Sequence, residues 1–89
     1  MSMDRMVNVR LYDPETGMEW RGRMPAATQF VALTDLLVEK GLKPFQPVGY
    51  GYIAAGHLCN NTFTLADYMP EDADAIDLRV FCYPQVLQG

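Results

Sequence analysis

The sequence predicts one α+β domain, in which a mixed β-sheet is crossed on one face by a single helix in the order β-β-α-β-β-β. Three observations lead to this prediction. Apolar and polar residues alternate over residues 6–12, 18–24 and 75–82, which is the period of half-buried strands. An apolar stripe with helical spacing occupies residues 29–40. At 89 residues, the chain has the length of one domain with one core.

The first two alternating segments predict an amino-terminal hairpin. Residues 13–17, of sequence Asp-Pro-Glu-Thr-Gly, separate residues 6–12 from residues 18–24. Proline suits the second position of a turn and glycine accepts a positive φ, so we expect the chain to reverse there. The apolar positions that share the inner face are Val7, Val9 and Leu11 in the first strand and Met18, Trp20 and Met24 in the second.

The helix is expected over residues 29–40. Thr28 can cap its first turn by accepting a backbone N–H. Gly41 suits a left-handed C-terminal cap, with Leu42 folding back onto the last turn. Two prolines in residues 43–47 then impose a loop. The buried stripe consists of Phe30, Leu33 and Leu37.

The second half of the chain supplies three further strands, expected at residues 48–53, 57–59 and 75–82. Tyr50 and Tyr52 share one face of their strand, and packing in the core is favoured over an exposed aromatic cluster with Phe45 that would bind protein. A helix between a hairpin and a returning strand lies across one face of a single mixed sheet, which is the β-grasp arrangement. The inward positions of the last strand are Ile76, Leu78 and Val80.

Charge and composition exclude several classes of function. The sequence contains seven Lys and Arg residues and eleven Asp and Glu residues, so its net charge is −4. This charge leaves no basic field that would attract nucleic acid. No apolar run reaches the roughly 18 residues of a membrane span, and the start of the sequence lacks an apolar leader. We therefore expect a cytoplasmic protein with neither a nucleic-acid partner nor a membrane partner.

Two candidate chemical sites are weak. His57, the single histidine, shares a predicted strand face with Cys59, so a contact between thiol and imidazole is possible, but no third orienting group accompanies them. Cys59 and Cys82 are expected to be free thiols that hold no metal. The acidic residues between positions 67 and 77 lack the oxygen spacing of a calcium loop and predict a solvated face. Hence no enzymatic activity, catalytic residue, metal or cofactor is expected.

Two adjoining segments resemble ubiquitin. Residues 52–58 read Tyr-Ile-Ala-Ala-Gly-His-Leu and residues 64–68 read Thr-Leu-Ala-Asp-Tyr, where ubiquitin has an Ala-Gly-Lys turn before Thr-Leu-Ser-Asp-Tyr. The resemblance implies a ubiquitin-like β-grasp domain over residues 6–83, between a flexible segment 1–5 and an extended tail 84–89. Fold follows from such a resemblance more directly than function.

The second of these segments also has a physical interpretation. Thr64 can cap a short helical turn, and Leu65 can fill the core as an apolar plug. The ring of Tyr68 can be buried if its hydroxyl finds a partner. The resemblance implies that this partner is a backbone group of the long preceding loop.

A partner surface is implied by the resemblance at Ile53, which matches the isoleucine at the centre of ubiquitin's binding face. Asp77 and Arg79 stand where ubiquitin has a histidine and a valine, and His57 replaces the lysine that follows Ala-Gly. Burying either charge against an apolar receptor costs free energy unless the charge is paired. We therefore expect a dedicated partner, rather than an ordinary ubiquitin receptor, on these four residues.

The lysines bear on chain formation. Ubiquitin uses several lysines to form chains, whereas this chain has only Lys40 and Lys43, so polymeric chains are not expected. Lys40, Lys43 and the terminal amine stay open as acceptors. From the residues alone, Lys40 complements the C-terminus of the helix and Lys43 is a solvated loop residue.

The tail leads to the main functional expectation. Leu87-Gln88-Gly89 resembles the Leu-Arg-Gly-Gly end of ubiquitin in its leucine and last glycine, and glycine offers the least steric hindrance to acyl transfer. The resemblance implies a protein modifier whose Gly89 is activated by an E1-like enzyme and conjugated by an E2-like enzyme to a target protein. It also implies a deubiquitinase-like protease that removes the modifier, and recognition of Val86, Leu87 and Gln88 by these enzymes.

The divergence from ubiquitin resembles bacterial ubiquitin-like modifiers that are associated with antiphage defence. Two alternatives stay open. One is a protein-binding subunit that is never conjugated, of the kind found as accessory proteins of secretion machines. The other is a sulfur carrier in which Gly89 becomes a thiocarboxylate, although such carriers usually end in two glycines and Gln88 counts against this alternative.

Overall fold

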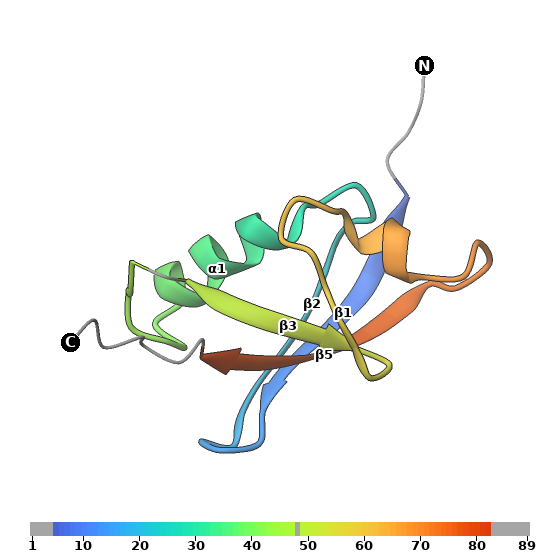
Figure 1. Ribbon diagram of the computed structural model, residues 1–89. Helices are drawn as coiled ribbons and strands as arrows, with labels where there is room; N and C mark the ends of the chain where they lie inside the picture. Colours follow the sequence, from blue (N-terminus) through green and yellow to red (C-terminus); the bar gives the residue numbers. More distant parts are fainter. Residues whose placement is uncertain (1–4, 48, 83–89) are drawn as a thin grey trace.

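The computed structural model describes residues 5–47 and 49–82, and within them it confirms the predicted order of elements (Figure 1). Of the predicted domain 6–83, residues 48 and 83 lie outside the described residues, as do residues 1–4 and the predicted tail. The elements are β1 (Met6–Asp13), β2 (Met18–Pro25), α1 (Phe30–Glu39), β3 (Tyr50–Ala54), β4 (His57–Leu58), the 3-10 helix η1 (Leu65–Tyr68) and β5 (Ala75–Cys82).

The strands form one mixed sheet in the order β2-β1-β5-β3-β4. β5 lies in the middle, parallel to β1 and antiparallel to β3, and the hairpin partners β1 and β2 are antiparallel. α1 crosses one face of this sheet (Figure 1). The predicted α+β architecture is therefore confirmed, and every strand has one face toward the helix and one face away from it, here called the outer face.

The core lies between α1 and the sheet, and the predicted periodicities place its residues correctly. The inward residues of β1 and β5 and the helical stripe are all buried. Tyr50 and Tyr52 are fully buried in the core, as predicted, whereas Phe45 is exposed in its loop. Met18, Trp20 and Met24 are only partly buried, because β2 is an edge strand. Burying each large apolar side chain contributes about 1.5–3 kcal/mol to folding.

The N-terminus of α1 differs from the prediction. The helix begins at Phe30 with Gln29 as N-cap, and neither Gln29 nor Thr28 caps it with a side chain. Instead, the Phe30 and Val31 N–H groups donate to the carbonyls of Phe63 and Asn61, at 3.1 and 3.0 Å. The expected cap at Thr28 is wrong because a loop distant in sequence satisfies the free N–H groups of the first turn.

The C-terminus of α1 agrees with the prediction. Gly41 has a φ of +71°, and its N–H donates to the Val38 carbonyl at 3.1 Å. The Leu42 N–H donates to the Leu37 carbonyl at 2.9 Å, which completes a Schellman motif. Leu42 packs against the core, so the chain turns back toward the sheet immediately after the helix.

Candidate functional site

The outer face of the sheet brings three of the four predicted partner residues together. Ile53 in β3 is the Cα partner of Arg79 in β5, and Arg79 is in turn paired with Tyr12 in β1. Asp77 lies two residues before Arg79 and is paired with Arg10. Paired residues in a sheet point to the same face, so these side chains form one surface.

Apolar side chains surround Arg79 on this face. Leu58 in β4 is the Cα partner of Ile53 and is 61% exposed. The ring of Phe81 lies over Gly51, its partner in β3, so closely that a Cβ at Gly51 would lie 2.3 Å from the ring. We call Ile53, Leu58, Arg79 and Phe81 the Ile53 patch. It combines an apolar surface with one exposed cation.

His57 does not join this surface. It is paired with Ala54, whose side chain is buried in the core, so the strand register places His57 on the opposite side from Ile53. The side chain is exposed at the edge of the sheet. A partner that covers the Ile53 patch would therefore reach His57 only around this edge.

The predicted tail residues Val86, Leu87 and Gln88 and the predicted conjugation site Gly89 lie outside the described residues. The described chain ends with β5 at Cys82, one residue after Phe81 of the Ile53 patch. Because β5 is the middle strand, the described chain ends beside the patch rather than at a sheet edge.

The segment around η1 is structural, as predicted. Thr64 is the N-cap of η1. Its backbone N–H and its hydroxyl both donate to the Asp67 carboxylate, at 2.8 and 3.1 Å. Leu65 is fully buried. The Tyr68 hydroxyl accepts a bond from the Asn60 N–H at 2.8 Å, which confirms its expected bond to the preceding loop.

The possible contact between His57 and Cys59 is not present. Cys59 is buried, at 2% exposed, whereas the His57 side chain is exposed at the sheet edge, and within the described residues no hydrogen bond joins the thiol to the imidazole. The Cys59 thiol donates to the His57 carbonyl, with Sγ 3.8 Å from the oxygen. Burial raises the pKa of this thiol and keeps it protonated. Cys59 and Cys82 are both free.

Within residues 5–47 and 49–82, no three His, Cys, Asp or Glu side chains are grouped so that they could hold a metal ion. Nor does the described part contain a helix of the length and apolarity that crossing a membrane requires.

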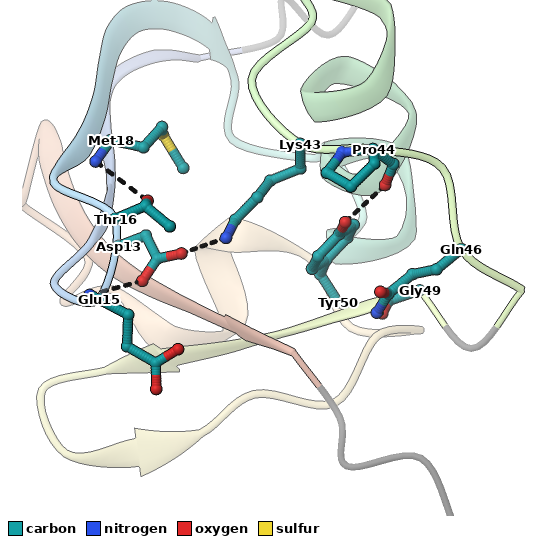
Figure 2. A network of polar contacts seen from close by, with 9 residues as sticks. All are labelled: Asp13, Glu15, Thr16, Met18, Lys43, Pro44, Gln46, Gly49 and Tyr50. Atoms are coloured by element: carbon teal, nitrogen blue, oxygen red, sulfur yellow. Dashed lines mark hydrogen bonds and ion pairs between the residues drawn. The ribbon is translucent and has the colours of Figure 1, made fainter.

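A buried ion pair joins the β1–β2 turn to the loop after α1 (Figure 2). The Lys43 ammonium donates to the Asp13 carboxylate, and the two residues are only 9% and 3% exposed. The expectation of a solvated Lys43 is therefore wrong. Once Gly41 reverses the chain, the Lys43 N–H donates to the Leu37 carbonyl at 3.2 Å, and this bond turns the side chain inward.

The surroundings of the pair explain its charge state. Burial alone would raise the pKa of Asp13, but bonds from Lys43 and from the Glu15 N–H, at 2.9 Å, lower it below its ordinary value. Burial alone would lower the pKa of Lys43, but Asp13 raises it. Lys43 Nζ also lies 5.7 Å from the centroid of the Tyr50 ring, whose hydroxyl donates to the Pro44 carbonyl. The pair is charged and structural.

Sequence reasoning missed this pair because no local pattern indicates it. The residues are 30 positions apart, and each looks like an ordinary turn or loop residue. The turn itself was predictable: Gly17 has a φ of +77°, and its N–H donates to the Asp13 carbonyl at 2.8 Å.

Comparison with known proteins gives structural matches alone. Neither a protein-family model nor a curated protein sequence matches this chain. A protein designed de novo on the basis of ubiquitin matches with a TM-score of 0.70 and 15% identity, over 96% of this chain and 98% of that one.

An Arabidopsis thaliana protein also matches, in two NMR structures. The structure that combines sparse NMR data with evolutionary couplings has a TM-score of 0.64 at 13% identity, over 96% of this chain and 95% of that one. The solution structure of the ubiquitin-like domain has a TM-score of 0.67 at 12% identity, over 92% and 82%. Together with the sheet order and the crossing helix, these matches show that the chain has the ubiquitin-like β-grasp fold.

Proposed function

We propose that this chain is a ubiquitin-like protein modifier of the bacterial cytoplasm, joined through Gly89 to amines of target proteins, with antiphage defence as its setting. The observation that supports this most is the position of the Ile53 patch. It lies on the outer face at the end of β5, next to the point where the segment carrying Leu87-Gln88-Gly89 begins. One partner enzyme can therefore hold the patch while it receives the segment.

The chemistry requires a free carboxyl group at Gly89, whether Gly89 ends the chain or is released by cleavage. Its carboxylate attacks the α-phosphorus of ATP, forming an acyl adenylate and releasing pyrophosphate. A thiolate of the E1-like enzyme displaces AMP to form a thioester, which an E2-like enzyme accepts by thiol exchange. An amine of the target then displaces the thiol and forms an amide. After the Gly89 carboxylate has attacked ATP, the partner enzymes supply both thiol nucleophiles, and the target supplies the amine.

The charges of the modifier restrict its partners. Arg79 stands among apolar side chains, so a receptor for the Ile53 patch needs a carboxylate beside an apolar anchor. The buried Lys43 is already paired with Asp13 and is a poor acceptor of a second modifier. Lys40 is exposed, and any chains built on a lysine of this protein would use it.

Conjugation is tested by expressing the native chain and a Gly89 deletion with their genomic neighbours. We expect intact-mass and gel analysis to show a DTT-sensitive adduct and DTT-resistant conjugates for the native chain, and neither for the deletion. Lys40→Ala is the matched control: it keeps the conjugates with target proteins and removes only chains on Lys40. Absence of both adducts from the native chain would contradict the proposal.

The exposed Leu58 favours one further candidate, a protein-binding subunit that is never conjugated. In that case both proteins keep their mass, and a partner protein co-purifies with each of them. Leu58→Asp, on a side chain that is 61% exposed, then releases the partner without unfolding the domain. A mass gain at Gly89 that equals the replacement of oxygen by sulfur would instead indicate a sulfur carrier.

A further inference from the structure

An open groove lies on the outer face where β1, β2 and β5 run side by side, beyond Asp77 from the Ile53 patch. Its volume is about 650 Å³, enough for several peptide side chains. It is open rather than enclosed, so it suits an extended chain lying on the sheet along β2 better than a small molecule that must be buried. Asn8, Arg10, Arg21, Arg23, Ala75 and Asp77 are among its lining residues.

The outer face is basic although the protein is acidic. It carries four arginines and two carboxylates, on a chain with seven cations and eleven carboxylates in total. Three of the four arginines line the groove. Arg21 has a side chain that is 72% exposed, and Arg23 is exposed and forms no ion pair with any other described residue. These guanidinium groups are available to a ligand.

Two of the groove arginines already contact a carboxylate of their own chain. Arg21 Nε donates to Glu19 at 2.5 Å, and Arg10 Nε lies 3.4 Å from the same oxygen of Glu19. The hydrogen bond from Arg21, and then the nearby Arg10 guanidinium, lower the pKa of Glu19. One carboxylate thus neutralises only part of two guanidinium groups, and each guanidinium has five N–H donors.

The spacing of the arginines matches an extended peptide. Arg21 and Arg23 are alternate residues of β2 and project to the same face, about 6.8 Å apart along the strand. Alternate residues of an extended peptide have the same separation. We propose that this groove binds an extended acidic segment of a partner protein, with carboxylates at alternate positions facing Arg21 and Arg23.

An acidic peptide fits better than nucleic acid. The net charge of −4 opposes the approach of a long polyphosphate, whereas a few carboxylates at fixed spacing need only the local basic groove. The inference is independent of Gly89, since the groove uses only residues of β1, β2 and β5.

The test is an NMR titration of the isotopically labelled full chain with a capped peptide that alternates Glu and Ser. We expect amide shifts confined to β1, β2 and β5 around Arg10, Arg21 and Arg23, and weaker binding as salt is raised. The same peptide with Gln for Glu should cause no shifts. Replacing both Arg21 and Arg23 by Ala should weaken binding about fivefold.

Matched variants separate a specific groove from general charge. Lys40→Ala removes an exposed cation at the C-cap of the helix and should leave the affinity unchanged. Replacing Arg21 and Arg23 by Glu should transfer binding to a peptide that alternates Lys and Ser. Equal loss with Lys40→Ala, or equal binding of the Gln peptide, would overturn the proposal. Tighter binding of an RNA oligonucleotide at the same amides would also overturn it, in favour of a phosphate ligand.

Discussion

This small domain contains two clusters in which a carboxylate contacts cationic side chains, and one cluster is buried whereas the other is exposed. Asp13 and Lys43 form a pair that is closed off from water between the hairpin turn and the loop after α1. Glu19 forms its contacts with Arg10 and Arg21 on the open outer face. The difference shows that burial, rather than the type of contact, decides whether an ion pair holds the fold together or is available to a partner.

The physical reason lies in the cost of removing charges from water. Each partner of the buried pair has lost its hydration, so removing one partner leaves the other without compensation. The side chains of the exposed cluster stay hydrated and are screened by salt. When one of them is removed, water takes over most of the contacts of the others, and the free energy of unfolding changes little. Stability and binding should therefore respond in opposite ways to changes in the two clusters.

The largest effect is expected from breaking the buried pair. Asp13→Asn keeps the size of the side chain and the acceptor for the Glu15 N–H, but leaves Lys43 buried without a counter-charge. We expect a loss of about 2–3 kcal/mol in the free energy of unfolding, measured by urea denaturation. Lys43→Met should cost a similar amount.

Combining the two substitutions distinguishes an ion pair from ordinary packing. The double variant Asp13→Asn, Lys43→Met contains no uncompensated charge, so it should be clearly more stable than the sum of the single losses predicts. Strictly additive losses would mean that the two side chains act independently, and that the buried contact is not an ion pair.

A smaller and graded effect is expected from pH. Asp13 has a pKa below its ordinary value of 3.8, so its contribution is complete above 3.8 and is lost as the pH falls through the lowered value. Lys43 has a raised pKa, so its contribution is complete below 10.5 and is lost as the pH rises through the raised value. The pair should stabilise the fold throughout the neutral range.

The double variant provides the reference for this measurement. The difference in unfolding free energy between the native chain and the double variant should be flat from above 3.8 to below 10.5, and should shrink outside those limits. A difference that changes near neutral pH would show that another group controls the pair.

The contrast between the clusters also explains which features could be predicted from the sequence. The strands and the helix follow from apolar periodicity, and the C-terminal cap follows from Gly41, because these signals are local. The cap at Thr28 failed because carbonyls of Asn61 and Phe63, more than 30 residues away, satisfy the same N–H groups. The expectation of a solvated Lys43 was wrong for the same reason, since Asp13 approaches Lys43 only in the folded sheet.

The outer face was predictable in part. Alternation places Ile53, Asp77 and Arg79 on one side once the strands are assigned, but only the register shows that Arg79 pairs with Ile53. Alternation did not show that His57 stays exposed at the sheet edge while Cys59, just after the two-residue β4, is buried. The groove forms only because the strands lie in the order β2-β1-β5. The sequence does not reveal this order, because β2 and β5 are far apart in the chain although both are neighbours of β1.

The smallest effect on stability is expected at Glu19, and it sharpens the contrast most. Glu19→Gln removes the exposed carboxylate while keeping the side-chain length, and the urea midpoint should stay unchanged within error at physiological salt. The same substitution removes the negative charge beside Arg10 and Arg21, so the alternating Glu and Ser peptide should bind about twofold more tightly. Asp13→Asn should change only the stability. If Glu19→Gln instead destabilised the fold as much as Asp13→Asn, exposure would not separate the two clusters.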